Sequence, residues 1–525
     1  MTVCRTLEQN QRPFSQPPRP WVLPKAKLKT YRHFDAIMSI EQAEALANDP
    51  ARVAAHAFYP LLRFDEIKRY FRRRDQPHRP SKLRPLRYAA RSDAYIYMRY
   101  RDWLSALYEE RLMAEGLDDV VLAYRRVASP YRPGNKCNID FAYDAVNHIR
   151  RLGDCYAICL DIKSFFENLD HARLKRVWAS VLGLPDLPPD HYRVFRSLTK
   201  YVQADLFEVY RRLGIWGQKT VGGRPTPVEG YLVDRRKIPV RLCDAETMRE
   251  IVFGDGGKHD RIAEVRTEAY GIPQGTPISD LLANMYMLDF DAEMKKLAAS
   301  SGGVYMRYSD DILFVVPAED IDPKAFVEGV SRSIGTYGDQ LQIAKDKTSI
   351  HRFTPAAKGQ TCQNAKEDAE RPSKRFEYLG FSFDGQKVRI RDSTMSSLVQ
   401  KVAAVAKREG VAAALRYPSK SVDQICEEFN YAGLYGRFLR VRDFETVEDK
   451  SDWTFWTYVR KIESTMKADG RPAMRQVRNL KVQIRRRFRL YVQTTRDGAP
   501  ARALQSAAAR LRQATPSNAE TAAQA

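Results

Sequence analysis

Two adjacent aspartates, Asp310 and Asp311, interrupt a segment that is otherwise apolar, β-branched and aromatic. Strand-forming residues at 304–308 and 312–316 flank them, which predicts a β-hairpin with both carboxylates at or beside its turn. Adjacent aspartates repel each other and have poor strand propensity, so a buried hairpin accommodates them best when a cation neutralises their charge. Carboxylate oxygens suit Mg²⁺. The alternative is an ordinary turn, because Asp and Ser are common turn residues.

A third carboxylate and a glycine-rich loop lie upstream. Residues 156–160 form an apolar strand that ends on Asp161, and a helix is expected after it, with Asn168 or Asp170 as its N-cap. Residues 271–275 read GIPQG, a loop whose backbone can approach a ligand closely. Taken alone, Asp161 could be a structural cap and GIPQG an ordinary loop. Their order relative to the two adjacent aspartates favours a common site.

Five segments between residues 155 and 383 resemble, in order, the palm motifs of reverse transcriptases: DIKSFF, GIPQGTPIS, YSDD, LQIAKDKT and FEYLGFSF. Within that family they resemble the prokaryotic lineage of group II intron, retron and defence-associated enzymes. Residues 83–97 and 131–149 resemble finger segments, so the resemblance covers about residues 80–390. It implies an α+β fold, a right-hand polymerase with fingers, a palm whose antiparallel sheet packs on helices, and a helical thumb.

The resemblance implies a two-metal centre for nucleotidyl transfer. Two Mg²⁺ ions about 3.5–4 Å apart activate a 3′-hydroxyl and stabilise the leaving pyrophosphate. In the family pattern Asp161 and Asp310 bridge the metals, Asp311 contributes less directly, and the carbonyl of Ile162 faces a metal. Mn²⁺ is an alternative ion.

By the same resemblance, residues around this centre bind the nucleotide. Phe166 matches the aromatic position that closes the 2′ side of the sugar, which implies deoxynucleotide substrates. The alternative for Phe166 is a core phenylalanine, as we expect for Phe165. Gln274 and Gly275 match the pair that contacts the dNTP in the family.

Basic residues complete the expected nucleotide site. Arg84 matches an arginine that grips the triphosphate, since a guanidinium fits phosphate oxygens in a bidentate way. The second gripping residue is Arg79 or Lys82, because His-Arg-Pro at 78–80 replaces the usual Ile-Pro-Lys. Lys347 matches a lysine near the leaving phosphate, with a surface lysine as an equal alternative. The residues expected to hold the primer end are Tyr378, Leu379 and Gly380.

Basic side chains gather in two segments of a chain whose formal net charge is +22, a balance that favours a polyanionic partner. Around Arg72, Arg73 and Arg74 they interleave with aromatic residues, which favours single-stranded template binding over a solvated helix face. Residues 471–496 lack Asp and Glu, and apolar residues from Val477 to Tyr491 recur there at helical spacing. We expect Arg485 and Arg486 to contact the duplex backbone, in preference to a helix lying on a membrane.

The amino-acid composition limits the possible cofactors and location of the protein. Seven cysteines without a CxxC pair argue against a disulfide framework or a zinc site. A secretory signal and an apolar run of about 18 residues are both missing, which predicts a cytoplasmic protein that does not contact a membrane. The predicted regions are an N-terminal arm and helical extension (1–75), fingers (76–154), a palm (155–390) with an insertion at about 204–268, a helical thumb (391–496) and a disordered tail (497–525).

The sequence therefore predicts an RNA-directed DNA polymerase. Its expected partners are a template RNA, dNTPs and the DNA product, and the resemblance implies that the template is a structured non-coding RNA. The protein could also form a homo-oligomer. The resemblance suggests a role in bacterial antiphage defence. Two alternatives are a template-independent terminal deoxynucleotidyl transferase and a non-catalytic RNA-binding scaffold on the same fold. The scaffold alternative is disfavoured by the presence of Asp161, Gln274, Asp310 and Asp311, because mutually repelling carboxylates have no use in a polymerase that has lost its activity.

Overall fold

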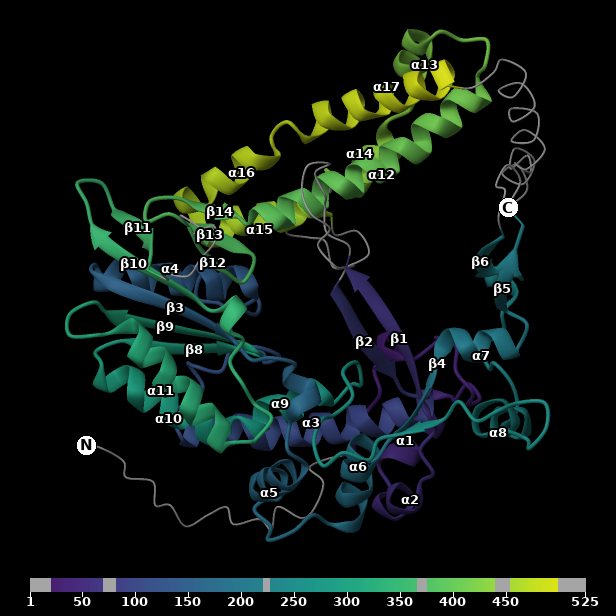
Figure 1. The fold of residues 1–525 in the computed structure, drawn as a ribbon, viewed down its shortest axis with the longest axis horizontal. Helices are drawn as coiled ribbons and strands as arrows, with labels where there is room; N and C mark the ends of the chain where they lie inside the picture. Colours follow the sequence, from purple (N-terminus) through teal and green to yellow (C-terminus); the bar gives the residue numbers. More distant parts are fainter. Residues whose placement is uncertain (1–19, 69–81, 221–226, 366–374, 440–453, 499–525) are drawn as a thin grey trace. The chain divides into compact units, whose positions relative to one another are not determined.

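The computed structural model describes residues 20–68, 82–220, 227–365, 375–439 and 454–498, which form two compact units (Figure 1). The first unit contains the described residues up to Arg125 together with Ile158–Ser349, and the second contains Arg126–Ala157 together with the residues from Ile350 onward. Helices combine with largely antiparallel sheets, so the predicted α+β class is confirmed. The border between the units falls inside the predicted fingers, since residues 126–154 group with the second unit.

The predicted hairpin is present in the first unit. Strands β8 (Val304–Tyr308) and β9 (Asp311–Pro317) pair in antiparallel register, with Tyr308 opposite Asp311. Residues 312–316 of β9 are fully buried, as their apolar sequence predicts. Strand β9 is flanked on its other side by β3 (Cys155–Asp161), and helix α10 (Leu288–Ser300) packs against the hairpin.

A second sheet of this unit has the order β2-β1-β4-β7, in which β1 (Leu61–Lys68) pairs antiparallel with β2 (Lys82–Tyr88) and parallel with β4 (Val202–Asp205). Residues 61–68 therefore form a strand inside a stretch expected to be a helical extension. Their partner in β4 is distant in sequence, so no local pattern indicates the pairing.

The helix after β3 resolves one sequence alternative. Asp170 caps α5 (His171–Val181), because its carboxylate accepts a hydrogen bond from the Arg173 backbone N–H at 2.7 Å. The Asn168 side chain instead donates to the Lys163 carbonyl at 2.9 Å. The other elements of the unit are η1 (Lys25–Lys27), α1 (Ile40–Ala47), α2 (Pro50–Ala55), α3 (Arg91–Ala114), η2 (Phe165–Asn168), α6 (Pro189–Thr199), α7 (Leu206–Arg212), β5 (Trp216–Lys219), β6 (Val228–Tyr231), η3 (Arg235–Lys237), α8 (Ala245–Phe253), β7 (Glu264–Val265), α9 (Ser279–Tyr286), α11 (Pro323–Thr336) and η4 (Lys345–Lys347).

The second unit combines short sheets with long helices. Helix α12 (Asp392–Arg416) packs along α17 (Leu480–Gly498), as Figure 1 shows. The buried side of α17 contains Ile484 and Phe488, as predicted, but it continues to Val492, whereas Tyr491 is only half-buried. The other elements are α4 (Asn138–Leu152), β10 (Ser349–Pro355), β11 (Gln360–Asn364), β12 (Phe376–Tyr378), β13 (Phe381–Phe383), β14 (Val388–Ile390), α13 (Val422–Glu428), α14 (Ala432–Phe438), α15 (Phe455–Met466), η7 (Lys467–Gly470) and α16 (Arg471–Val477).

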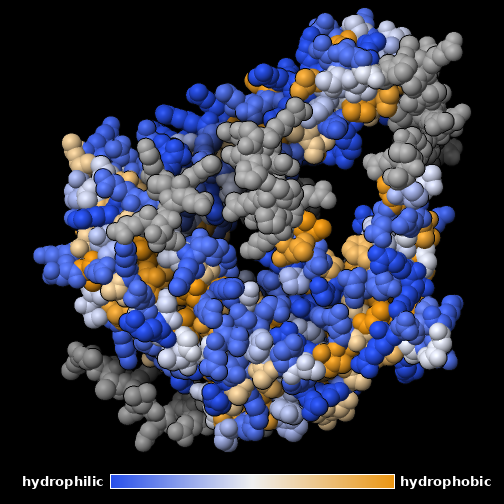
Figure 2. Space-filling model, viewed as in Figure 1, coloured by the Kyte–Doolittle hydropathy of each residue, from blue (hydrophilic) through white to orange (hydrophobic). Residues whose placement is uncertain are grey.

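The surface of the basic helix is polar. Figure 2 shows mainly hydrophilic residues over α16 and α17, and the exposed side chains of α17 include Lys481, Arg485, Arg486 and Arg489. Throughout the described ranges, every helix is too short or too polar to span a membrane.

Candidate active site

The turn between β8 and β9 is the centre of the candidate site. Ser309 and Asp310 connect the strands, and Ser309 has a left-handed backbone with φ of +61°. This conformation is uncommon for a residue other than glycine, so surrounding contacts must hold it. Asp310 is half-buried and Asp311 is exposed, which leaves both carboxylates at the edge of the fold.

Arg307 is the contact that holds this turn. Its guanidinium donates through Nη1 to the Ser309 carbonyl at 3.0 Å and, through Nε and Nη2, forms two bonds with the Asp291 carboxylate at 2.7 and 2.6 Å. Both side chains are fully buried. Nη1 also donates to Asn284 Oδ1 at 3.1 Å, and the Tyr305 hydroxyl donates to Asp291 at 2.6 Å. The buried charges are thus paired and hydrogen-bonded, as burial requires.

Electrostatics keep this arginine charged. Burial by itself would lower the pKa of Arg307, but the adjacent Asp291 carboxylate raises it above its ordinary value. The Arg307–Asp291 pair is not among the residues predicted from the sequence. The available signal was a charged residue, Arg307, inside an apolar strand, which requires a buried partner.

Asp161 lies beside the turn. The N–H of Ile162, the next residue, donates to the Asp310 carbonyl at 3.0 Å, so the two predicted metal-binding aspartates belong to neighbouring chain segments. The Ala344 N–H donates to the Asp161 carbonyl at 2.8 Å. This pairing places Lys347 Nζ 2.5 Å from Asp161 Oδ2. The segment LQIAKDKT therefore brings a cationic group to one of the carboxylates.

The oxygen atoms near the turn are of the kind that bind hard cations such as Mg²⁺. Asp161 and Asp310 would offer carboxylate oxygens to such an ion, and the buried Ile162, which follows Asp161, would offer a backbone carbonyl. Within the ranges that the structure describes, no cluster of three or more His, Cys, Asp or Glu side chains is arranged to hold a metal ion. Lys347 contacts Asp161 through Oδ2, so a metal at that oxygen would compete with the ammonium.

The GIPQG loop lies against β2. The Arg87 N–H donates to the Gln274 carbonyl at 2.9 Å, and a Cβ on Gly275 would come within 2.5 Å of the Arg87 carbonyl oxygen. Gly275 also has a positive φ of +116°, so glycine is required at this contact. The contact brings the strand that carries Arg84 beside Gln274 and Gly275. The Arg84 side chain is half exposed and lies 3.7 Å from the Glu66 carboxylate.

The same loop contacts the segment that follows Asp161. The Ile272 N–H donates to the Phe166 carbonyl at 2.8 Å. Phe165 is 3% exposed and belongs to the core, as predicted, whereas Phe166 is only half-buried. The structure thus joins Phe166 to the loop that carries Gln274 and Gly275.

Tyr378, Leu379 and Gly380 lie in the second unit. Leu379 and Gly380 form the turn between β12 and β13, with φ values of +44° and +91°. Asn138 Nδ2, on α4, donates to the Leu379 carbonyl at 3.1 Å and to the Tyr458 hydroxyl at 3.2 Å. The Leu379–Gly380 turn is therefore held by α4, and through Asn138 it is linked to α15.

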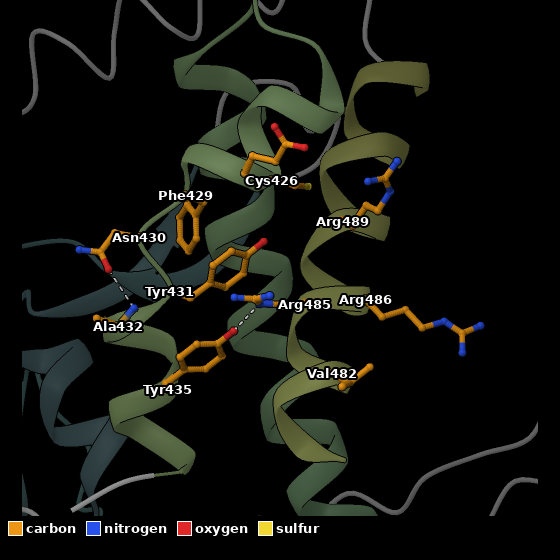
Figure 3. A pocket seen from close by; sticks show the side chains of 11 residues that line it. Cys426, Phe429, Asn430, Tyr431, Ala432, Tyr435, Val482, Arg485, Arg486 and Arg489 are labelled. Atoms are coloured by element: carbon orange, nitrogen blue, oxygen red, sulfur yellow. Dashed lines mark hydrogen bonds between the residues drawn. The ribbon is translucent and has the colours of Figure 1, made fainter. Parts of the chain in front are cut away.

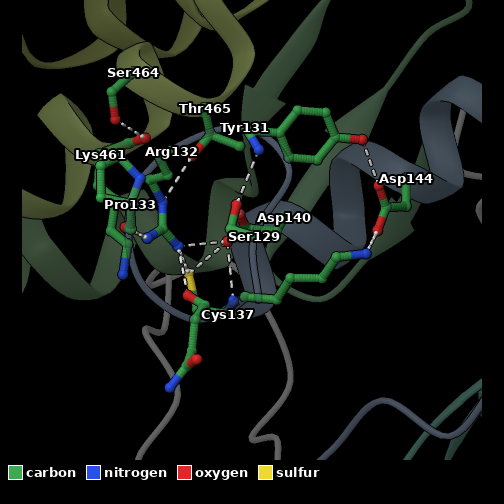
Figure 4. Close-up of polar contacts among 12 residues, drawn as sticks. Ser129, Tyr131, Arg132, Pro133, Cys137, Asp140, Asp144, Lys461, Ser464 and Thr465 are labelled. Carbon is green, nitrogen blue, oxygen red and sulfur yellow. Dashed lines mark hydrogen bonds and ion pairs between the residues drawn. The ribbon is translucent and has the colours of Figure 1, made fainter. Parts of the chain in front are cut away.

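The segment 131–140, expected in the fingers, is fixed inside the second unit (Figure 4). Arg132 donates to the buried Asp140 carboxylate at 2.7 Å and to Thr465 Oγ1 at 3.2 Å. The Cys137 N–H donates to the same carboxylate at 2.9 Å, at the start of α4. The segment therefore joins α4 to α15.

Arg485 lines an open pocket of about 820 Å³ beside α17 (Figure 3). Its Nε donates to the Tyr435 hydroxyl at 2.6 Å, and its guanidinium lies 5.2 Å from the centre of the Tyr431 ring. The two tyrosine rings are stacked at 5.7 Å. Arg486, the next residue, also lines the pocket. This combination of arginine and aromatic side chains is typical of nucleic-acid surfaces.

Five predicted contacts lie outside the described residues: Arg72, Arg73, Arg74 and Arg79 entirely, and the side chain of Lys82.

Comparison with known families gives this arrangement a context. Residues 237–383 match the family model described as reverse transcriptase (RNA-dependent DNA polymerase). This segment is similar to reverse transcriptases. The match includes GIPQG, the turn at Ser309–Asp310 and Tyr378–Gly380, whereas Asp161 lies before it. The match supports a reverse-transcriptase fold for residues 237–383, and the α+β class expected from the sequence is confirmed.

Solved structures with some similarity include telomerases from two yeasts. One is a structure of apo telomerase from Candida tropicalis, truncated from the C-terminal domain. It is 12% identical to this chain, with a TM-score of 0.32, and the alignment covers 59% of this chain and 53% of the telomerase chain. Telomerase from Candida albicans with a fragment of telomeric RNA is 13% identical, with a TM-score of 0.33 over 90% of this chain and 65% of that one. The chain thus spans between half and two thirds of these telomerase chains. No curated protein matches it in sequence.

Proposed function

We propose that the chain is an RNA-directed DNA polymerase of the prokaryotic lineage that it resembles. The observation that carries the proposal is the hydrogen bond from Ile162 to Asp310, which joins two aspartate-bearing segments beside a loop that matches reverse transcriptases. Convergent carboxylates on separate strands are the arrangement that two-metal nucleotidyl transfer requires.

The residues divide the work of the reaction. Asp161 and Asp310 would hold two Mg²⁺ ions, with Asp311 adjacent, and the ions would activate the 3′-hydroxyl and stabilise the leaving pyrophosphate. Lys347 would leave Asp161 and interact with the phosphates. Arg84 binds the triphosphate, Gln274 and Gly275 contact the nucleotide, and Phe166 excludes a 2′-hydroxyl. Tyr378, Leu379 and Gly380 hold the primer end.

The proposed partners are an associated structured RNA as template, dNTPs and the DNA product. Support comes from the net charge of +22 and from the arginine and tyrosine surface of α17. We place the enzyme in the cytoplasm and assign it to antiphage defence on the basis of its resemblance to defence-associated enzymes.

Purified protein with its co-purifying RNA, Mg²⁺ and dNTPs should make DNA. Asp310→Asn should abolish synthesis, because it removes the charge that holds the metals. A matched control is Glu319→Gln, which removes one negative charge from an exposed residue beyond the far end of β9. Unchanged synthesis by Asp310→Asn with a normal melting temperature would contradict the site assignment.

Sequencing the products separates the alternatives. Products complementary to the RNA support templated synthesis. Products that are the same with and without RNA would indicate a terminal transferase, and RNA binding without any synthesis would indicate a scaffold.

A further inference from the structure

Tyr124 combines an unusual backbone with an exposed ring. Its φ is +62°, a left-handed conformation that is a genuine outlier for a bulky residue. Its side chain is 46% exposed, although Val121, Leu122 and Ala123 before it are buried. Strain of this kind persists where the surrounding structure fixes the chain, and it is concentrated at functional sites.

The chain before Tyr124 is fixed to the strand that leads into the catalytic turn. The Leu122 N–H donates to the Arg307 carbonyl at 2.9 Å, and the Arg307 N–H donates to the Val120 carbonyl at 2.8 Å. Asn284 Nδ2 donates to the Ala123 carbonyl at 2.8 Å. Arg307 and Asn284 are therefore shared between the turn at Ser309 and the segment that presents Tyr124.

The chain after Tyr124 is fixed as well. Arg125 donates to both carboxylate oxygens of Glu109, at 2.9 and 2.7 Å, and its Nη1 donates to the carbonyls of Asp118 and Val121, each at 2.6 Å. With both neighbours anchored, the backbone at Tyr124 has no freedom to relax. The Cα–Cβ direction of Tyr124 is therefore fixed.

The phenol lies within electrostatic reach of the candidate site. Burial raises the pKa of Tyr124, the charges of Asp280 and Asp310 raise it further, and the charge of Arg84 lowers it. The net effect is a raised pKa, so the phenol stays neutral at pH 7. The hydrogen bonds of residues 120–123 with Arg307 and Asn284 place Tyr124 beside the turn that carries Asp310, where a metal is proposed. Arg84, where the triphosphate is proposed, lies within electrostatic range of the phenol.

We propose that Tyr124 is a nucleotide-binding residue whose exposed ring stacks on the base of the incoming dNTP. The inference rests on the proposed polymerase function. An aromatic face accepts any base, because every base has a π face. An incoming nucleotide would extend between the proposed triphosphate site at Arg84 and the proposed metal site at Asp310, so an exposed ring beside the turn is within reach of its base. Fixed strain at Tyr124 then positions the ring before the nucleotide arrives.

Tyr124→Asn is the decisive variant, because asparagine tolerates the left-handed backbone and removes the ring. We expect its KM for dNTPs to rise about tenfold, the order of one stacking contact. The affinity for RNA should be unchanged. The melting temperature should be unchanged or higher, because the strained backbone is relieved. Tyr124→Gly should behave in the same way. Tyr124→Phe keeps the ring, so its KM should stay near that of the wild type. Tyr192→Asn is the control, since Tyr192 is 41% exposed on α6.

The outcomes separate this inference from the proposed function. Wild-type synthesis with an unchanged KM in Tyr124→Asn and Tyr124→Gly would overturn the stacking role alone. A Tyr124→Phe variant as impaired as Tyr124→Asn would also overturn it, because the hydroxyl and not the ring would then matter. Weaker RNA binding with an unchanged KM would assign Tyr124 to the nucleic acid instead. The absence of synthesis by the wild type would contradict the polymerase itself.

Discussion

Arg307 in the first unit and Arg485 in the second use the same side chain in opposite ways. Arg307 is fully buried, and the Asp291 carboxylate neutralises its charge through two hydrogen bonds. Arg485 is exposed, and its described contacts are with neutral tyrosines: a hydrogen bond to Tyr435 and the ring face of Tyr431. The first arginine fixes a turn inside the fold. The second keeps its positive charge available for a polyanion.

The contrast identifies which positive charges serve structure and which serve binding. A guanidinium held by carboxylates contributes little to the outward field, whereas one held by phenols is positioned without being neutralised. Arg408, also in the second unit, belongs to the first kind despite its exposure, because it contacts Glu409 at 2.7 Å. The partner of an arginine is therefore more informative than its exposure.

The largest effect is expected from breaking the Arg307–Asp291 pair. Arg307→Met leaves the Asp291 carboxylate buried and unpaired, and it should lower the free energy of unfolding of the first unit by about 3–5 kcal/mol. Asp291→Leu should have a similar effect. Thermal denaturation followed by near-ultraviolet circular dichroism measures both.

The double variant Asp291→Leu/Arg307→Met sharpens the comparison. It removes both charges, so much of the lost stability should return, since apolar replacements of a buried pair are often neutral. Synthesis should remain low, because the bond to the Ser309 carbonyl is still missing. A double variant with full activity would show that Arg307 supports the fold without positioning the turn.

These contacts mark the limit of prediction from sequence. The hairpin around Asp310, the strand that ends on Asp161 and the GIPQG loop could be predicted, because hydrophobic alternation and turn residues are local signals. Partners such as Asp291 for Arg307 could not, because tertiary packing chooses them. Tyr124 carries no local signal, since its left-handed backbone is imposed by contacts on both sides.

A smaller and selective effect is expected at Phe166. Its neighbour Phe165 is in the core, but Phe166 is only half-buried and is joined to the GIPQG loop through its backbone, so Phe166→Ala should change selectivity with little loss of stability. We expect discrimination between dNTPs and rNTPs to fall by roughly 10–100-fold, the order of a removed steric contact in a substrate pocket. The ratio of kcat/KM for dATP and ATP measures it.

The control for this change is Phe253→Ala, which truncates a phenylalanine that is 38% exposed on α8. It should leave the ratio unchanged. Unaltered sugar discrimination in Phe166→Ala, with synthesis intact, would return Phe166 to a purely structural role.

The smallest effect is expected at the surface arginines of α17, and it tests the comparison most directly. Arg485→Ala and Arg486→Ala should each weaken nucleic-acid binding at low salt and reduce the slope of log Kd against log salt by about 1, since each removes one phosphate contact. Stability should change by less than about 0.5 kcal/mol, as is usual at surfaces. Arg408→Ala should leave the salt slope unchanged, because Glu409 already neutralises that arginine. A slope that falls equally in all three variants would show that net charge alone governs binding, and the distinction between arginines held by carboxylates and arginines held by phenols would be wrong.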